Sequence, residues 1–289
     1  MCGFNGFYLN NICEKQDLLN QVNLMSATIE HRGPDDSGAW VEEDIGLALG
    51  HRRLSIVDIS EAGHQPMHSH SSRFIIAFNG EIYNHKELRA QLELLSRDSI
   101  WRGTSDTETL LAAFEHWGVE DTLDKLVGMF AISLWDKIEK KLYLIRDRFG
   151  EKPLYFGWIN TPDDSVFAFG SELKCFRAYK GFSNKVSRVA LKEYFRFMYV
   201  PAPYSIYENI FKLEAGCILI LDGAPPKASP DAPPHPLEGI DFKYLNIIVK
   251  RWYSVKERIS SQAGKSFKSE CVAYDALERQ LQETIQIQS

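Results

Sequence analysis

The stretch GMFAISLWDKIEKKLYLIRDRFGEKPLYFGWINTPDDSVFAFGSE, residues 128–172, decides the class of fold. It contains four short runs rich in β-branched and aromatic residues: MFAISLWD, KLYLIRD, PLYFGWI and SVFAFGSE. Polar, turn-type residues separate each run from the next. This pattern is typical of antiparallel strands joined by short connections. We therefore predict an antiparallel meander over residues 128–172.

Helices and further strands are predicted on both sides of this stretch. Apolar residues recur at helical spacing over residues 16–30, and Ser105 begins the capping-box pattern Ser-Asp-Thr-Glu ahead of a second apolar helix face. We also expect a helix over 188–199 and another near the C-terminus. The expected strands are IGLALGH (45–51), RLSIVD (53–58), RFIIAFNG (73–80) and CILILDG (217–223).

The composition excludes several classes of protein. The chain has 289 residues, of which 44% are hydrophobic and 25% charged, as in ordinary globular proteins. A net charge of −6 without a basic stripe argues against nucleic acid as a partner. No apolar run approaches the roughly 20 residues that span a bilayer, and no signal peptide is visible. Five widely spaced cysteines indicate neither a disulfide framework nor a CxxC metal site, so we expect a cytoplasmic protein.

The opening MCGFNGF, residues 1–7, places Cys2 directly behind the initiator methionine. Removal of Met1 would make Cys2 the N-terminal residue and provide its α-amine as a base. Free thiols have a pKa of about 8.5 and α-amines one of about 7.7–8.0, near the pH at which a general base must work. N-terminal nucleophiles that use their own amine are an alternative to the Cys–His pair. A cysteine at position 2 also arises by chance, and this motif alone leaves both interpretations open.

Four further motifs follow in order: HRGPDDSG (31–38), HRRLSIVD (51–58), FNGEIYN (78–84) and GTSDTE (103–108). Each has a plain structural interpretation. They are a Gly-Pro turn, a buried strand, an Asn-Gly hairpin turn and a helix N-terminus favoured by an acidic residue. Taken singly, none of them indicates a function.

In this order, and together with MCG, the motifs closely resemble the glutaminase domain of the glutamine-hydrolysing asparagine synthetases. That family is a class II, N-terminal-nucleophile branch of the glutamine amidotransferases. The likeness continues through GMFAISLWD, RDRFGEKPLYFG and SELK, and covers roughly residues 2–221. RLSIVD favours this branch over other class II amidotransferases. The resemblance implies an α+β fold, a four-layer αββα sandwich of two antiparallel sheets flanked by helices.

The resemblance also implies which residues are catalytic. Cys2 would attack the side-chain amide of glutamine and form a glutamyl thioester. The Asn79 side-chain amide and the Gly80 backbone N–H would form the oxyanion hole, and a close backbone approach suits glycine at position 80. His31 and Arg32 are expected to support the site. The segment RDRFGEKPLYFG is either a charged hairpin loop or part of a boundary with a synthetase domain, where SELK (171–174) would also lie.

A second group of residues is expected to recognise glutamine. Arg53 would bind the α-carboxylate, because a guanidinium group can hold it in a bidentate fork. Glu81 and Asp106 would supply negative charge for the α-ammonium. Main-chain groups would complete the pocket near Leu54, Ile56 and Val57.

The resemblance divides the chain into three parts. Residues 2–221 would form the glutaminase domain, 222–253 a proline-rich loop and the domain end, and 254–289 the incomplete start of a synthetase domain. Residues 222–239 hold six of the twelve prolines, which favours an extended loop. The sequence contains no SGGxDS loop, with which the family's synthetase domain binds ATP. We expect no cofactor for the glutaminase reaction and assign ATP and magnesium to the missing domain.

The expected partners are glutamine and a synthetase domain in cis or in trans, and a homodimer is left open. Two alternative functions are also left open. The chain would then be an amidotransferase of the same branch that serves a different acceptor, or a non-catalytic binding module. A self-cleaving N-terminal-nucleophile hydrolase would need an internal processing site, and none is evident in the sequence.

Overall fold

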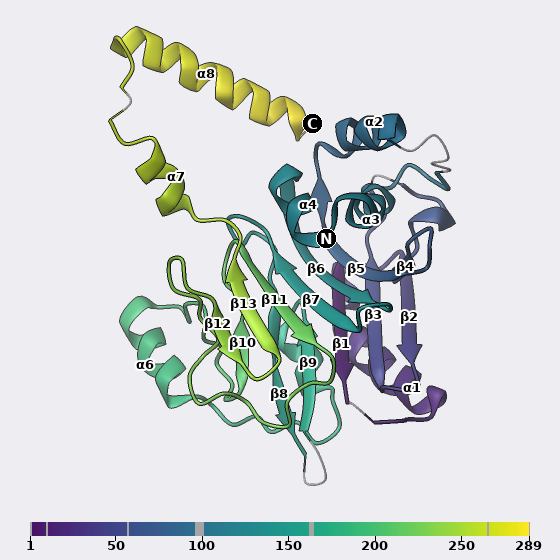
Figure 1. Cartoon of the computed structure of the whole chain (residues 1–289). Helices are drawn as coiled ribbons and strands as arrows, with labels where there is room; N and C mark the ends of the chain where they lie inside the picture. The colour runs from purple at the N-terminus through teal and green to yellow at the C-terminus, as the bar shows by residue number, and fades with distance from the viewer. Residues whose placement is uncertain are drawn as a thin grey trace.

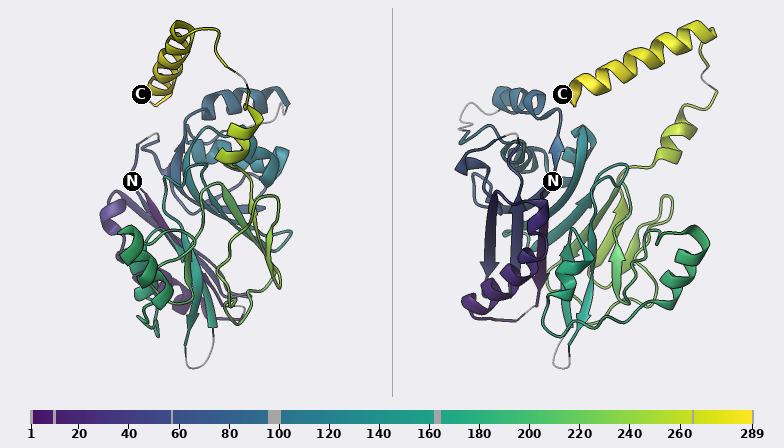
Figure 2. Two further views of the ribbon diagram at one scale, coloured as in Figure 1. Left: turned by 90° about the vertical axis from the view of Figure 1, so that its left-hand side faces the viewer. Right: turned by 180° about the vertical axis from the view of Figure 1, so that it is seen from behind.

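Two antiparallel β-sheets lie face to face in the computed structural model, and helices cover their outer faces (Figure 1). The structure describes residues 2–9, 11–56, 58–95, 101–161, 165–264 and 266–288. Figure 2 shows the layers edge-on and from behind. The architecture confirms the predicted αββα sandwich.

The first sheet carries the N-terminus of the chain. Its strand order within the described residues is β10-β8-β9-β1-β3-β2, so β1 lies in the interior of the sheet between β9 and β3. The strands are β1 (Gly3–Tyr8), β2 (Asp36–Glu42), β3 (Leu47–Arg53), β8 (Tyr155–Asn160), β9 (Ser165–Gly170) and β10 (Ile210–Lys212).

The second sheet faces the first across an apolar layer. Its order within the described residues is β12-β13-β11-β7-β6-β5-β4. The strands are β4 (Met67–His68), β5 (Phe74–Ile82), β6 (Gly128–Asp136), β7 (Lys141–Arg146), β11 (Cys217–Asp222), β12 (Phe242–Tyr244) and β13 (Ile247–Arg251). The layer between the sheets includes Phe4, Leu49, Trp135, Trp158 and Phe169, all almost fully buried.

Helices cover the outer face of each sheet. On the first sheet, α1 (Lys15–Ala27) buries one apolar stripe, as the helical spacing over 16–30 predicts, and α5 (Leu173–Arg177) packs into the same core. On the second sheet, α3 (Asp106–Trp117) and α4 (Val119–Lys125) bury a separate core, and α2 (His85–Leu95) packs beside α3. No helix of the described residues has the length and apolar character needed to cross a membrane.

The capping box predicted at Ser105 is only half formed. The Ser105 hydroxyl accepts a hydrogen bond from Thr107 N at 3.1 Å, as an N-cap residue should. Glu108 does not return to the N-cap. Its carboxylate instead accepts hydrogen bonds from the backbone N–H groups of Arg102 and Gly103, at 2.8 and 3.1 Å. Glu108 therefore fixes the segment that leads into α3.

The single meander predicted over 128–172 is wrong. β6 pairs with β7 in the second sheet and β8 pairs with β9 in the first, so this stretch forms two hairpins on opposite sides of the sandwich. The chain crosses between the sheets through residues 147–154. Each hairpin alone fits the strand pattern. The switch between sheets depends on which face of each strand is buried, and this stretch by itself does not specify that.

The prediction of a strand over RLSIVD is also wrong. β3 ends at Arg53, and Leu54 and Ile56 lie in a loop in which the Ile56 side chain is 67% exposed. Conversely, β2 lies within and beyond HRGPDDSG, where no strand was predicted. Polar and glycine residues occupy much of β2, and it is held by its pairing with β3 rather than by local propensity.

The C-terminal part adds an edge to the second sheet and then leaves it. Residues 223–241 contain no strand or helix, as their proline content predicts. β12 and β13 follow, and β13 pairs with β11. α7 (Val255–Ser261) and α8 (Glu270–Ile287) then extend beyond the sandwich (Figure 1). The predicted helices are present at α6 (Arg188–Phe197) and α8, whereas the domain boundaries at 221 and 253 stay predictions.

One buried histidine connects the two sheets. His51 of β3 is fully buried, and its Nε2 lies 2.9 Å from the carbonyl oxygen of Phe78 in β5. Because a carbonyl only accepts, Nε2 carries a proton. Burial lowers the pKa of His51 to about 4, and the Phe78 carbonyl opposes that shift.

This histidine makes the fold sensitive to acid. Its pKa is depressed in the folded state, so its contribution is complete above the unfolded pKa of about 6.5 and is lost as pH falls toward 4. Between pH 7 and pH 5 this one group should remove about 2 kcal/mol of the free energy of unfolding. We expect His51→Gln, which keeps a donor, to lose that part of the pH dependence in urea unfolding. The exposed control His70→Gln should keep it, and equal pH dependence in both variants would contradict the assignment.

Candidate active site

Cys2 lies at the start of β1, against the end of β3. Gly3 pairs with Arg52, and beyond that pair the Leu54 backbone N–H donates to Cys2 Sγ at 3.3 Å. The thiol in turn lies 3.5 Å from the Leu54 carbonyl oxygen. Burial raises the pKa of the Cys2 thiol, although the Leu54 backbone and nearby positive charges oppose this. A base must therefore remove the thiol proton before Cys2 becomes a nucleophile.

A buried arginine holds the backbone of Cys2 from behind. Arg32 Nε donates to the Cys2 carbonyl oxygen at 2.9 Å, and Arg32 Nη1 donates to Glu172 at 3.0 Å. Glu172 also contacts His31 and Lys174, at 3.0 and 3.1 Å. Burial alone would raise the pKa of Glu172, but hydrogen bonds from Arg32, Lys174 and His31 lower it overall. The HRG motif and SELK thus support Cys2 together.

Asn79 and Gly80 of β5 line the same cavity as Cys2. Asn79 is 1% exposed, and its Nδ2 has no hydrogen-bond partner among the described residues. A Cβ on Gly80 would lie 2.3 Å from the Met129 carbonyl oxygen and 2.7 Å from Phe130 Cα, so β5 can pair closely with β6 only if this residue is glycine. A buried amide donor without a partner costs stability, and near a nucleophile it can stabilise an oxyanion.

A cavity of about 100 Å³ brings the predicted residues together. Within the described chain its lining includes eight of the nine, which are Cys2, Arg53, Leu54, Ile56, Asn79, Gly80, Glu81 and Asp106. The ninth, Val57, lies outside the described residues. The residues come from β1, β3, β5, the start of α3 and the loop after β3, segments separated by up to a hundred residues of sequence.

Asp106 places a carboxylate at the bottom of this cavity. It begins α3, is 6% exposed, and accepts a hydrogen bond from Ile82 N at 3.0 Å. Burial raises the pKa of Asp106 to about 6; hydrogen bonds from Ile82 and Thr107 oppose this shift, and the charge of Glu81 adds to it. The helix N-terminus alone would favour an acidic residue there. The burial of this carboxylate near that of Glu81 costs folding free energy. A helix cap alone does not require such burial.

Arg53 makes contacts that its predicted role did not include. Its Nη1 donates to the Ser60 carbonyl oxygen at 2.9 Å, and its Nη2 donates to the Asp58 carbonyl oxygen. The guanidinium group therefore holds the loop after β3 in place while it lines the cavity. The structure does not test its role as a clamp for a carboxylate.

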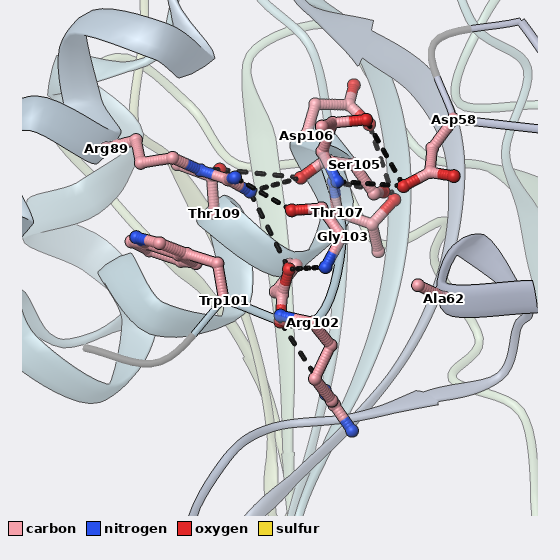
Figure 3. Close-up of polar contacts among 12 residues, drawn as sticks. Asp58, Ala62, Arg89, Trp101, Arg102, Gly103, Ser105, Asp106, Thr107 and Thr109 are labelled. Carbon is pink, nitrogen blue, oxygen red and sulfur yellow. Dashed lines mark hydrogen bonds and ion pairs between the residues drawn. The ribbon is translucent and has the colours of Figure 1, made fainter. Parts of the chain in front are cut away.

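Asp58, the last residue of RLSIVD, anchors this loop at its far end. Its carboxylate accepts from the Ser60 hydroxyl at 2.6 Å and from Thr104 N at 2.8 Å. The Ser60 hydroxyl in particular lowers the pKa of Asp58 to about 2. Figure 3 shows Asp58 reaching across to the segment that precedes Asp106. The loop that covers Cys2 and the segment that positions Asp106 are thus joined.

Arg89 of α2 fixes the other side of that segment (Figure 3). It donates to the carbonyl oxygens of Gly103 and Ser105, at 2.9 and 3.1 Å, and to the Thr109 hydroxyl at 3.1 Å. One guanidinium group thereby satisfies three acceptors at the entrance to α3. The position of Asp106 follows from this network rather than from its own hydrogen bonds alone.

Sequence reasoning missed several residues that line or shape the cavity. Gln65 accepts a hydrogen bond from Phe78 N at 2.7 Å and is buried, yet it belongs to no motif that drew attention. Asp58 and Lys152 lie inside motifs that were noticed, RLSIVD and RDRFGEKPLYFG, but they received no role. In both cases the signal is an ionisable residue within the motif, since Asp58 ends RLSIVD and Lys152 lies in the middle of RDRFGEKPLYFG.

A model of the glutamine amidotransferase domain matches residues 1–228 of this sequence. The chain belongs to that family. Asparagine synthetase [glutamine-hydrolyzing] 1 of Bacillus subtilis is 40% identical over 220 residues, which is 75% of this chain and 33% of that protein. Asparagine synthetase [glutamine-hydrolyzing] 3 of the same organism is 40% identical over 200 residues, 68% of this chain and 30% of that protein.

A more distant relative is amidase chry2 of Gibberella zeae, which is 30% identical over 235 residues, 76% of this amidotransferase chain and 32% of that protein. The chain spans less than half the length of these curated relatives. Among solved structures, the glutamine phosphoribosylpyrophosphate amidotransferase of B. subtilis is similar, with a TM-score of 0.57 and 18% identity over 88% of this chain and 50% of that one. That likeness supports the fold.

The buried carboxylate should cost this amidotransferase domain stability at neutral pH. The folded pKa of Asp106 is raised, so the cost is absent below the unfolded value of about 4 and grows as pH rises through 6. We expect Asp106→Asn to raise the free energy of unfolding by about 1–3 kcal/mol at pH 7 and by nothing at pH 3.5. Urea unfolding at the two pH values measures this. Asp231→Asn, in an exposed loop, is the control, and a gain that is independent of pH would contradict the explanation.

Proposed function

We propose that this chain is the glutaminase unit of a glutamine-hydrolysing asparagine synthetase, in which Cys2 is the nucleophile. The observation that carries the proposal is the presence of two groups in the lining of one cavity. These groups are Cys2 and the buried Asn79, whose amide nitrogen has no hydrogen-bond partner among the described residues. Acyl transfer needs a nucleophile and an oxyanion donor on either side of one carbonyl carbon.

The reaction follows from these groups. With Met1 removed, the Cys2 α-amine accepts the thiol proton, and Sγ attacks the Cδ atom of glutamine. The carbonyl oxygen becomes an oxyanion that receives hydrogen bonds from Asn79 Nδ2 and the Gly80 N–H. Collapse of this intermediate breaks the Cδ–N bond, and the protonated amine returns its proton to the leaving ammonia. Water then hydrolyses the glutamyl thioester to glutamate, which regenerates the thiol.

The charges around the cavity suit the two ends of glutamine. Glu81 and Asp106 supply negative charge for the α-ammonium group, and its arrival would favour ionised Asp106 against the effect of burial. Arg53 is proposed for the α-carboxylate, with the N–H groups that the loop carbonyls leave free. Backbone groups near Leu54 and Ile56 complete the pocket, and Val57 is proposed with them.

The ammonia acceptor is proposed from the relatives. Two of them are named asparagine synthetases, which favours activated aspartate as the acceptor, with ATP and magnesium held by a synthetase domain in cis or in trans. A different acceptor in the same branch is the second candidate, because a more distant relative is named an amidase. None of the five cysteines, all of which the structure describes, forms a disulfide, in keeping with the cytoplasmic location that is part of this proposal.

Replacement of the nucleophile gives the first test. Cys2→Ala should abolish release of ammonia from glutamine because no thioester can form, while circular dichroism and urea unfolding stay as in the unaltered protein. Intact-mass spectrometry of the unaltered protein should show loss of Met1. The matched control is Cys13→Ala, in a cysteine outside the cavity lining, which should keep full activity. Full glutaminase activity in Cys2→Ala, or a retained Met1 in active protein, would contradict the proposal.

Removal of the oxyanion donor gives the second test. Asn79→Ala should lower kcat for glutamine hydrolysis by roughly 10²–10³ with little change in KM, because the lost hydrogen bond forms mainly in the transition state. Steady-state kinetics with ammonia detection measure the two parameters separately. Asn20→Ala, on the exposed face of α1, is the control. A rise in KM at constant kcat would instead assign Asn79 to ground-state binding.

A further inference from the structure

The turn RDRFGEK, residues 146–152, is built around one buried carboxylate. Asp147 is 0% exposed. Its oxygens accept hydrogen bonds from four backbone N–H groups, those of Phe130 (3.2 Å), Phe149 (3.0 Å), Glu151 (2.9 Å) and Lys152 (2.9 Å). These four donors satisfy the carboxylate and join the turn to β6. A hairpin loop that only connected two strands would not need a fully buried charge at its centre.

Arg146 fixes the same turn from outside. Its side chain donates to the carbonyl oxygens of Lys152 and Gly150, at 2.8 and 2.6 Å, and to that of Leu213 at 2.6 Å. Gly150 has a φ of +68°, a conformation that favours glycine, and a Cβ there would lie 3.0 Å from the Arg146 guanidinium carbon. The backbone of Lys152 is thus held by Asp147 through its N–H and by Arg146 through its carbonyl.

This construction places the Lys152 side chain in the wall of the cavity that contains Cys2. Lys152 is 5% exposed and lines the cavity together with Cys2, Glu81 and Met129. Burial lowers the pKa of Lys152 and repulsion from Arg32 adds to this, whereas Glu151, Asp147 and Glu81 favour the charged form. Lysine is almost never this buried unless its ammonium group is paired, because that group is costly to remove from water.

Charged side chains from several elements line the cavity or contact Cys2. Arg32 contacts the Cys2 carbonyl, and Glu172 balances its charge at 3.0 Å. Arg53 of β3 donates to the carbonyls of the loop, and its charge also lowers the pKa of the Cys2 thiol, against the larger effect of burial. The carboxylates that face the cavity are Asp58, Glu81 and Asp106, from the loop, β5 and α3. The glutamine ammonium group that the proposed function places beside Glu81 and Asp106 would balance these two in the bound state.

We propose that Lys152 is a positioning residue of the glutaminase reaction, whose ammonium group holds the Cys2 α-amine in its uncharged, proton-accepting form. The inference rests on the proposed function. A positive charge in the same cavity disfavours protonation of a nearby amine, and a low-dielectric site strengthens that effect. Without it, an α-amine with a pKa of about 7.7–8.0 would be mostly protonated at neutral pH and unable to take the thiol proton. In this proposal the turn RDRFGEK serves the reaction because it holds Lys152 in the wall of the cavity.

The test is the pH dependence of glutamine hydrolysis in Lys152→Met, which keeps the length of the side chain and removes its charge. The acid limb of the kcat/KM profile should move to higher pH by about one unit. The value of kcat/KM would then be about tenfold lower than in the unaltered protein at pH 6.5 and little changed at pH 9. Lys152→Arg should restore the limb of the unaltered protein. Lys250→Met, which removes an equal charge from an exposed pair with Glu120, should leave the profile unchanged.

A second readout does not depend on turnover. Reductive ¹³C-methylation labels the Cys2 α-amine, and an NMR titration then follows its protonation, with an expected midpoint about one pH unit higher in Lys152→Met. A KM increase with an unmoved acid limb would overturn the proposal and assign Lys152 to the substrate carboxylate. A loss of kcat/KM of the same size at all pH values, with an unchanged midpoint of the amine titration, would overturn the proposal in favour of a purely structural role for Lys152. If the unaltered protein released no ammonia, the proposed function would fail, and the amine titration would still decide the effect of Lys152.

Discussion

Cys2 precedes the first residue of β1, so the strand holds it from one side only, and the rest of the site depends on this constraint. β1 meets it by lying in the interior of a sheet, paired with β3 from Gly3 onward and with β9 from Asn5 onward. Two more contacts extend the restraint to the terminus itself. Arg32 binds the Cys2 carbonyl, and the Leu54 N–H binds its sulfur. The residues that line the cavity, including those of the loop after β3, lie together with Cys2 at this end of β1.

Several features of the site oppose folding. Asp106 is buried as a carboxylate beside a second acid, and the Asn79 amide lacks a partner among the described residues. Each feature lowers the free energy of unfolding, whereas an apolar core side chain in its place would not. The two apolar layers, one between the sheets and one under α3 and α4, offset these costs. Under the proposed function these costs have a reason, because a site that binds a charged substrate and an oxyanion is less stable in their absence.

Side chains in the two loops around Cys2 act mainly on backbone. Arg53 and Asp58 hold the loop after β3, and Arg146 and Asp147 hold the turn before β8. In each loop an arginine donates to carbonyl oxygens while a carboxylate accepts from N–H groups. This arrangement rigidifies irregular segments that have no ladder of their own, and it brings Leu54 and Lys152 into the lining of the cavity together with Cys2.

The sequence by itself determined eight of the residues that meet at the site, the N-cap of α3, the amphipathic helices and the strand character of most runs. These features depend on consecutive residues or on motifs in a recognisable order. Only the tertiary structure decided that residues 128–172 divide between two sheets, that RLSIVD leaves the sheet after Arg53, and that Asp147 and Arg146 carry Lys152 into the cavity. Sheet membership and loop position depend on burial against residues far away in the chain, here β11, β1 and α3. A local pattern cannot encode those long-range contacts.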